Sequence, residues 1–157
     1  MGTQEIFIQY IKEHEALIYK IARVYSATPE DLEDLYQEIV YQAWKSFASF
    51  RQDSRFSTWL YRIALNTSIT HSARSKRSSV QELGDIHIHY ADPHLEEQVE
   101  MLYSEVSRLD KIEKAIVLLY LEGRSYEEIA SITGFSATNI GTRLSRIRLK
   151  LKKQINK

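Results

Sequence analysis

Cysteine is absent from the 157-residue chain, and so are long apolar runs. Without cysteine the chain forms no disulfide and offers no thiolate for catalysis or metal binding, so its redox compartment stays undetermined. No apolar run approaches the length of a signal peptide or of a membrane-spanning helix. The sequence therefore predicts a soluble, cytoplasmic protein that does not insert into membranes.

Motifs of enzymatic chemistry are also missing. There is no glycine-rich phosphate-binding loop and no His-Glu-x-x-His zinc pattern. His87, His89 and His94 lie near one another in an acidic stretch and offer at most a weak chelate, so a linker that contains histidines is the favoured interpretation. We expect no catalysis, no metal, no cofactor and no small-molecule substrate. The alternative, an enzyme with a DNA-binding tail, would need a catalytic constellation in residues 1–77.

The charges are unevenly distributed, although the formal net charge is zero. Residues 78–107 hold seven acidic residues and no Lys or Arg, whereas residues 136–157 hold seven Lys or Arg and no acidic residue. Residues 50–77 are basic as well, with six Lys or Arg against one Asp. Two basic blocks on either side of an acidic one suggest two contacts with anionic partners in a single chain.

Apolar residues recur at helical spacing through the first half of the chain. They predict helices over residues 3–26, 29–47 and 56–77. Thr28, Pro29 and Asp31 supply an N-cap, a first-turn proline and a capping acid for the second of these helices. Residues 48–55 break the pattern and should form a loop. We expect these elements to make one small domain, residues 1–77.

Residues 78–93 contain Gly84 and Pro93 without helical periodicity, which indicates a flexible acidic linker. After it, the spacing of apolar residues predicts a helix that begins near Pro93, and Asp110 is expected to cap a further helix that Gly123 ends. No convincing strand is present. The predicted fold is all-α, with two small helical domains, the second formed by residues 94–157.

Residues 124–153 have the pattern of a helix-turn-helix. Ser125 and Glu128 predict a capping box on a short helix that Gly134 ends, and Phe135 is expected to fill the turn. Ser136 should cap a longer helix, whose apolar stripe is Ile140, Leu144, Ile147 and Leu151 and whose basic stripe is Arg143, Arg146, Lys150 and Lys153. A solvated hairpin is the alternative, but the absence of acidic residues from the longer helix favours insertion into the DNA major groove.

The stretch from Phe50 to Arg77 combines aromatic rings with basic residues. Single-stranded DNA binding uses this combination, because bases stack on rings while cations hold the phosphates. Helical spacing assigns Phe56, Trp59 and Leu60 to the core instead. Phe50 and the polar loop residues around it are the better candidates for contacts with bases.

Three stretches resemble, in this order, the extracytoplasmic-function (ECF) sigma factors of the sigma-70 family. They are DLYQEIVYQAWKSFASFR at 34–51, FSTWLYRIALNTSITHSAR at 56–74, and LEGRSYEEIASITGFSATNIGTRLSRIRLKL at 121–151. The resemblance covers nearly the whole chain. It implies an initiation factor that binds core RNA polymerase, directs it to promoter DNA through the −10 and −35 elements, and is itself bound by an anti-sigma factor.

The resemblance also assigns roles to residues. Sigma region 2 in the first domain implies polymerase docking through Asp34, Gln37 and Glu38. It implies recognition and melting of the −10 element by Ser49, Phe50, Arg51, Gln52, Asp53, Arg55, Arg62, Asn66, Thr70, Arg74 and Arg77. Sigma region 4 in the second domain implies contacts with the −35 element by Ser136, Ala137, Thr138, Asn139, Thr142, Arg143 and Arg146.

Some positions depart from the family's pattern. Gly141 stands where a basic residue is frequent, and Asn139, where Thr is common, can make a bidentate contact to adenine. Thr70 and His71 replace more usual amide or acidic residues, which affects the expected −10 preference. A stand-alone helix-turn-helix regulator is the alternative function, but it leaves the Asp34–Glu38 face and residues 50–77 without a role.

Overall fold

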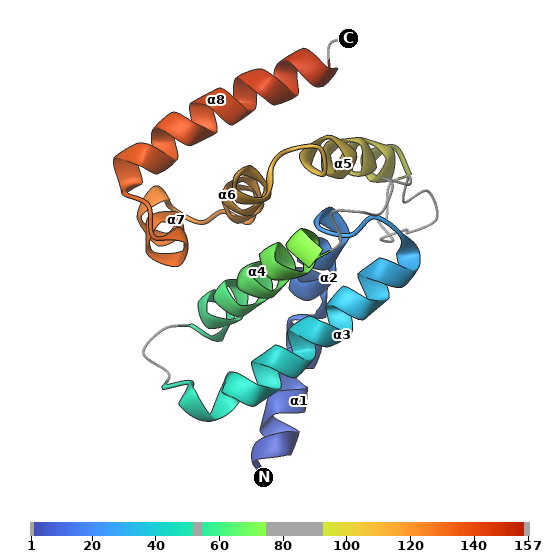
Figure 1. Cartoon of the computed structure of the whole chain (residues 1–157), viewed down its shortest axis with the longest axis vertical. Coiled ribbons are helices and arrows are strands. Elements are labelled where there is room, and N and C mark those ends of the chain that lie inside the picture. The colour runs from blue at the N-terminus through green and yellow to red at the C-terminus, as the bar shows by residue number, and fades with distance from the viewer. Residues whose placement is uncertain (1, 52–54, 75–92, 156–157) are drawn as a thin grey trace. The chain divides into compact units, whose positions relative to one another are not determined.

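The computed structural model describes residues 2–51, 55–74 and 93–155. The chain separates into two compact units, residues 1–83 and 84–157. Within the described ranges every regular element is a helix, which confirms the predicted fold class (Figure 1). Residues 78–92 of the expected linker, with His87 and His89, lie outside these ranges. No helix among the described residues is both long and apolar enough to cross a membrane.

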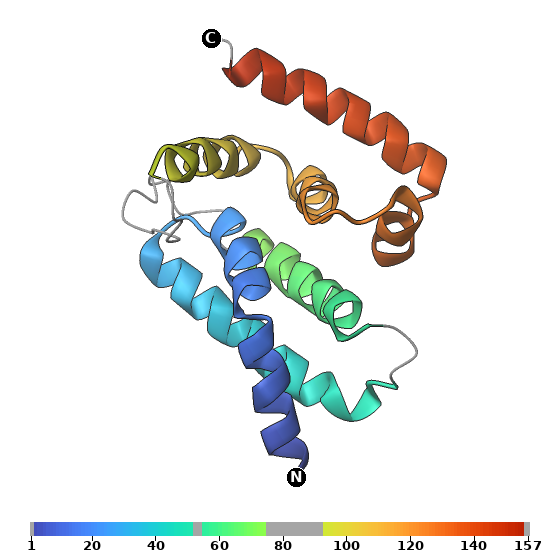
Figure 2. The same ribbon diagram turned by 180° about the vertical axis from the view of Figure 1, so that it is seen from behind.

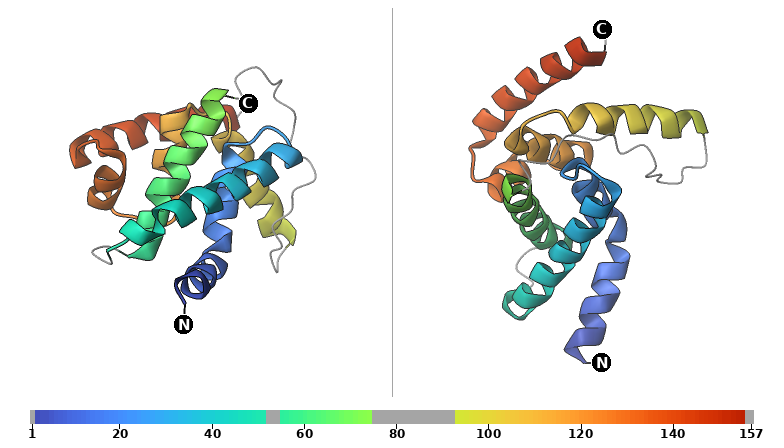
Figure 3. Two further views of the ribbon diagram at one scale, coloured as in Figure 1. Left: turned by 60° about the horizontal axis from the view of Figure 1, so that its bottom comes forward. Right: turned by 45° about the vertical axis from the view of Figure 1, so that its right-hand side comes forward.

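The first unit begins with two helices where the apolar spacing predicts one. α1 (Thr3–Glu13) and α2 (Glu15–Val24) meet at His14, whose φ of −121° and ψ of 19° are not helical (Figure 3). The His14 ring Nδ1 lies 2.7 Å from the Tyr10 carbonyl oxygen, and the His14 backbone N–H donates to Ile11 instead. A side chain that competes for a main-chain acceptor therefore interrupts the helix, while the apolar residues on both sides remain buried.

α3 (Pro29–Ser46) starts as the sequence predicts. Thr28 Oγ1 accepts from the Asp31 backbone N–H at 3.0 Å, and Asp31 Oδ2 accepts from the Ala27 backbone N–H at 3.1 Å. The cap is therefore reciprocal, although the carboxylate reaches one residue further back than in a standard capping box. A short 3-10 turn, η1 (Phe47–Ser49), continues α3. α4 (Phe56–Arg74) follows, and its expected extension to residue 77 lies outside the described residues.

Helices α2, α3 and α4 pack against one another and share the core of the first unit (Figure 2). The core face of α3 follows its apolar spacing, because Leu32, Leu35, Ile39 and Ala43 are all buried, whereas Phe47 after the helix is half-buried. Burying one such Leu or Ile side chain contributes roughly 1.5–3 kcal/mol. The apolar core therefore fixes α3 beside α4. Its largest fully buried side chains are Ile18, Ile21, Val24, Leu35, Ile39 and Leu60.

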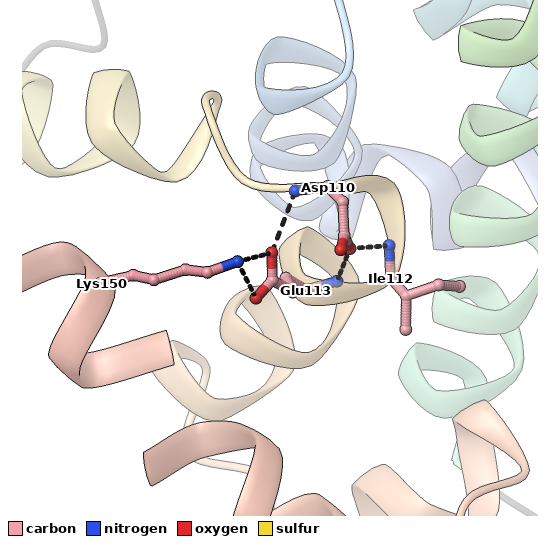
Figure 4. A network of polar contacts seen from close by, with 4 residues as sticks. All are labelled: Asp110, Ile112, Glu113 and Lys150. Atoms are coloured by element: carbon pink, nitrogen blue, oxygen red, sulfur yellow. Dashed lines mark hydrogen bonds and ion pairs between the residues drawn. The ribbon is translucent and has the colours of Figure 1, made fainter. Parts of the chain in front are cut away.

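The second unit opens with α5 (Pro93–Val106) and α6 (Lys111–Leu121). Asp110 caps α6 as predicted, since its Oδ1 accepts from the backbone N–H groups of Ile112 and Glu113 at 3.0 and 2.8 Å. Glu113 Oε1 accepts from the Asp110 backbone N–H at 3.3 Å, which completes a capping box (Figure 4). This cap fixes the start of α6, whose apolar side packs on α7 and α8.

The predicted helix-turn-helix is confirmed as α7 (Tyr126–Thr133) and α8 (Ala137–Ile155). Ser125 and Glu128 form the capping box of α7, and Gly134 takes the left-handed conformation with φ 88°. Only glycine adopts that conformation without steric cost, so the turn can be this sharp. In the apolar stripe of α8 three residues are buried, Ile140, Leu144 and Ile147, whereas Leu151 is half-buried.

Candidate nucleic-acid interface

α3 presents a ridge that faces away from the core of the first unit. Asp34 and Gln37 are exposed on it, and Glu38 is half-buried. The same face continues with Tyr41 and Trp44, which are 54% and 42% exposed. These two rings are not among the predicted contact residues. Tyr41 lies seven residues from Asp34 and Trp44 lies seven residues from Gln37, and this spacing is the signal that places both rings on the ridge.

An aromatic cluster of Phe47, Phe50, Phe56 and Trp59 holds the loop that is predicted to contact bases. The Phe50 ring centroid lies 5.1 Å from that of Trp59 and 5.6 Å from that of Phe56, and Phe50 stacks on Phe47 at 6.3 Å. Ring pairs at such distances stabilise by about 0.5–1.5 kcal/mol beyond their burial. Because Phe50 is half-buried, it anchors the loop and still presents part of its ring to the surface.

Polar and basic side chains surround this cluster. Ser49 is exposed and donates through its hydroxyl to the Ser46 carbonyl at 2.7 Å. Arg51 and Arg55 are exposed on either side of the segment 52–54. The predicted contacts Gln52 and Asp53 belong to that segment and lie outside the described residues. The described part of the loop thus pairs a ring with two cations, which suits an unstacked base and its phosphates.

One face of α4 carries the remaining predicted −10 contacts. Arg55, Arg62, Asn66 and Thr70 follow one another at spacings of seven, four and four residues, which places them along one side of the helix. Asn66 and Thr70 are exposed and Arg62 is half-buried. Arg74 is the last residue of α4, and Arg77 lies outside the described residues.

A groove of about 410 Å³ lies between α3 and α4. Within it, the expected polymerase contacts Asp34 and Glu38 approach the expected −10 contacts Asn66 and Thr70. The structure therefore brings together two sets of residues that the sequence pattern assigns to different partners. The groove is lined by Asp34, Glu38 and Gln42 from α3 and by Asn66, Thr67, Thr70 and His71 from α4.

His71, a departure from the family pattern, links the end of α4 to the start of α3. Its Nε2 lies 2.5 Å from Asp31 Oδ1. The other carboxylate oxygen of Asp31 caps α3, so a single side chain serves both helices. Sequence spacing gives no signal for this contact, because the two residues are 40 positions apart. The structure gives His71 a role in positioning the groove.

The N-terminal turn of α8 is formed as the sequence predicts. Ser136 Oγ accepts from the Asn139 backbone N–H at 3.1 Å. Thr138 and Thr142 are exposed one turn apart, and the Thr142 hydroxyl donates to the Thr138 carbonyl at 3.2 Å. Ala137 is half-buried beside them. These residues form the outer face of the first two turns, which is the part of a recognition helix that reaches base edges.

Arg143 is held by two neighbours from the predicted motif. Its guanidinium carbon lies 4.2 Å from the centroid of the Phe135 ring, and its Nε donates to Asn139 Oδ1 at 2.7 Å. Phe135 is half-buried in the turn, where the sequence places it. The two residues singled out separately as DNA contacts, Asn139 and Arg143, are thus bonded to each other.

The cations of α8 are divided between two tasks. Lys150 Nζ donates to both carboxylate oxygens of Glu113 on α6, at 3.0 and 2.9 Å (Figure 4). This bond raises the pKa of Lys150 above its ordinary value. Arg148 lies over the Tyr120 ring, 4.8 Å from its centroid, and donates to the Tyr120 hydroxyl. Both cations therefore brace α8 against α6, whereas Arg146 is exposed along the helix.

Gly141 has a structural explanation that the sequence pattern does not reveal. A Cβ at this position would lie 3.4 Å from Tyr126 Cε2 on α7. Gly141 therefore faces the first helix of the motif and not the outer face of α8. The first carbon of any larger side chain there would therefore lie against Tyr126.

Two stretches of the chain match known family descriptions. Residues 10–78 match Sigma-70 region 2, and residues 100–151 match Sigma-70, region 4. The first match contains α3, the aromatic cluster and α4, and the second contains α6, α7 and residues 137–151 of the basic helix α8. Each surface described above thus falls within one matched region.

Similar proteins cover most of the chain. The RNA polymerase sigma factor YlaC of Bacillus subtilis is 34% identical over 99% of this chain and 93% of its own length. The ECF RNA polymerase sigma-E factor of Haemophilus influenzae is 34% identical over 80% of this chain and 75% of its own length. The sigma factor RpoE of Bartonella quintana, solved with the anti-sigma factor NepR, has the same fold, with a TM-score of 0.78 and 22% identity over 97% of this chain and 98% of that one. The chain belongs to the ECF sigma factors of the sigma-70 family.

Proposed function

We propose that the protein acts in the cytoplasm as a promoter-specificity subunit, which binds core RNA polymerase and brings it to promoters with particular −10 and −35 elements. The observation that carries this proposal is the order of region 2 and region 4, each with its own basic surface, on either side of an acidic stretch. Such a subunit performs no reaction of its own. We propose residues 1–77 as the functional region 2 domain, residues 78–93 as the linker and residues 94–157 as the region 4 domain.

The α3 ridge is the proposed polymerase contact. Asp34, Gln37 and Glu38 supply polar groups at its centre, and the exposed rings of Tyr41 and Trp44 supply apolar area beside them. Interface cores are enriched in aromatic residues that are ringed by polar groups. A basic, partly apolar surface on the polymerase fits this ridge.

The loop after α3 and the outer face of α4 are proposed to capture the −10 strand. Unstacking a base costs a few kcal/mol, so a pocket has to offset that cost. Phe50 is already fixed by its ring neighbours, which lowers the entropy lost on stacking with a base. Arg51, Arg55 and Arg62 would hold the phosphates on either side.

The partners of this subunit follow from its surfaces and from its relatives. Promoter DNA would meet α8 in the major groove at the −35 element, and the acidic linker 78–93 would occupy a basic channel of the polymerase, the path of the emerging RNA. The Bartonella structure holds an anti-sigma factor, and we propose an anti-sigma partner for this chain as well.

Reconstitution tests the proposal. The protein is mixed with core RNA polymerase and genomic DNA of the source organism, and the 5′ ends of the transcripts are sequenced. We expect starts that depend on the protein and share two upstream elements. Tight DNA binding without association with the polymerase would instead identify a stand-alone regulator.

A further inference from the structure

The guanidinium of Arg143 makes two contacts within the helix-turn-helix. Phe135 lies against one of its faces, with 4.2 Å from the guanidinium carbon to the ring centroid, and Asn139 Oδ1 accepts from Nε at 2.7 Å. Arg143 is itself only half-buried. An arginine side chain loses rotamer entropy when it is fixed, and these contacts remove part of that loss before DNA arrives.

The bond to Asn139 determines which edge of Arg143 remains available. Nε donates within the protein, so the two terminal nitrogens form the outward pair of parallel N–H donors. That fork matches two acceptors in one plane, which are the O6 and N7 atoms of guanine in the major groove. A phosphate also accepts from such a fork. The site lies in the second turn of α8, however, and the N-terminal turns of a recognition helix contact bases.

The same bond changes the role of Asn139. A bidentate contact to adenine uses the amide oxygen as acceptor and the amide nitrogen as donor on a single base edge. Because Oδ1 accepts from Arg143, the amide plane is turned towards the arginine. Asn139 is therefore suited to position Arg143, and the separate adenine contact that its identity suggests is disfavoured.

We propose that Arg143 reads a guanine in the −35 element, and that Asn139 and Phe135 are positioning residues for it. The proposal rests on the proposed function, since it requires α8 to enter the −35 major groove. The preference for one base pair of the promoter is then set by a single unit, which consists of Phe135, Asn139 and Arg143.

A selection experiment on the holoenzyme tests this unit. Core RNA polymerase with the full-length chain selects upstream sequences from a promoter library, first with the parent protein and then with Arg143→Lys, Asn139→Ala and Phe135→Leu. Arg143→Lys keeps the charge and removes the fork, and Phe135→Leu keeps an apolar plug without an aromatic face. Arg148→Lys is the matched control, because it is the same change on α8 at a cation that packs against Tyr120 of α6.

We expect the parent to select a guanine at one position and Arg143→Lys to lose about tenfold of that preference, in line with a bidentate contact. Asn139→Ala and Phe135→Leu should relax the same position, and Arg148→Lys should leave it unchanged. The losses of guanine preference caused by Asn139→Ala and by Arg143→Lys should be strongly non-additive when the two changes are combined. Thermal unfolding of each variant identifies any that fail to fold. If Phe135→Leu fails to fold, Asn139→Ala still provides the test, because Asn139 is exposed on α8.

Other outcomes contradict the inference. If Asn139→Ala relaxes an adenine at a different position, Asn139 reads its own base. If Arg143→Lys alters no base preference while Arg143→Ala lowers the salt dependence of binding, the partner is a phosphate. A parent holoenzyme that selects no upstream element would overturn the proposed function itself, which is a separate result.

Discussion

At the scale of single residues, the two glycines of the helix-turn-helix should respond oppositely to the same substitution. Gly134 has φ 88°, so Gly134→Ala should cost roughly 1–2 kcal/mol of unfolding free energy. Gly141 has ordinary helical geometry, and an added Cβ would only touch Tyr126 at 3.4 Å. Gly141→Ala should therefore raise the unfolding free energy by about 0.5–1 kcal/mol.

Urea unfolding of the full chain measures both changes, with an unchanged m-value as the control for the unfolded state. A loss of stability in Gly141→Ala would mean that the approach of α7 to α8 depends on the missing side chain. Sequence alone identifies Gly134 as the turn residue, because of its place between two caps. It gives no indication that Gly141 faces Tyr126, since that contact arises only when the helices pack.

At the scale of elements, the capping box of α7 makes the stability of the fold depend on pH. The pKa of Glu128 lies below its ordinary value of 4.5, first because Arg124 donates to its carboxylate at 3.1 Å and then because the Ser125 backbone N–H does. A carboxyl with a lowered folded pKa stabilises the fold above its unfolded pKa, and the stabilisation is lost as pH falls through the folded value. The effect should be small, because the carboxylate is exposed.

Glu128→Gln should therefore lower the melting temperature slightly at neutral pH, and the difference from the parent should shrink as the pH falls below 4.5. Gln can still accept from the backbone as a capping residue, so the comparison isolates the charge. Circular dichroism melts across this range provide the measurement. A difference that stays constant with pH would show that the carboxylate charge does not contribute.

The division of the basic stripe of α8 predicts different salt dependences for its cations. Arg146 is exposed, and Arg146→Ala should reduce the slope of log K against log salt by about one unit if it meets a phosphate. Lys150→Ala should change that slope less and instead lower stability, because Lys150 bonds Glu113. Binding of the holoenzyme to promoter DNA at several salt concentrations, with urea unfolding of both variants, separates the two roles. Equal slopes for both variants would contradict this division.

Helix caps and apolar stripes are the part of these elements that sequence predicts well. Thr28, Asp110, Ser125 and Ser136 all cap the helices assigned to them, because capping depends on neighbours within three residues. The break at His14 is missed, since a ring that bonds the preceding turn leaves the apolar spacing unaltered. The contact of His71 with Asp31 and that of Lys150 with Glu113 join distant segments, and no local pattern encodes them.

At the scale of the whole molecule, contacts with the polymerase and with DNA should be separable by mutation. Charge reversal at Asp34 and Glu38 should abolish co-purification with core RNA polymerase by placing cations on the proposed docking ridge. Charge reversal at Glu5 and Glu13 is the matched control, because both residues are exposed on α1 and lie outside the proposed ridge. Equal loss in both variants would indicate a non-specific effect of charge. Circular dichroism of each variant verifies that the helices remain folded.

Opening of the −10 element tests the central claim most directly, because only a factor that holds polymerase and DNA together should produce it. Permanganate reactivity of thymines is measured on a promoter found by reconstitution, with core polymerase, the protein, or both. We predict reactive thymines about one helical turn upstream of the start only when both are present, and a loss of reactivity with the charge-reversed α3. Protection of an upstream site by the protein alone, with no reactive thymines in the complete mixture, would contradict the account.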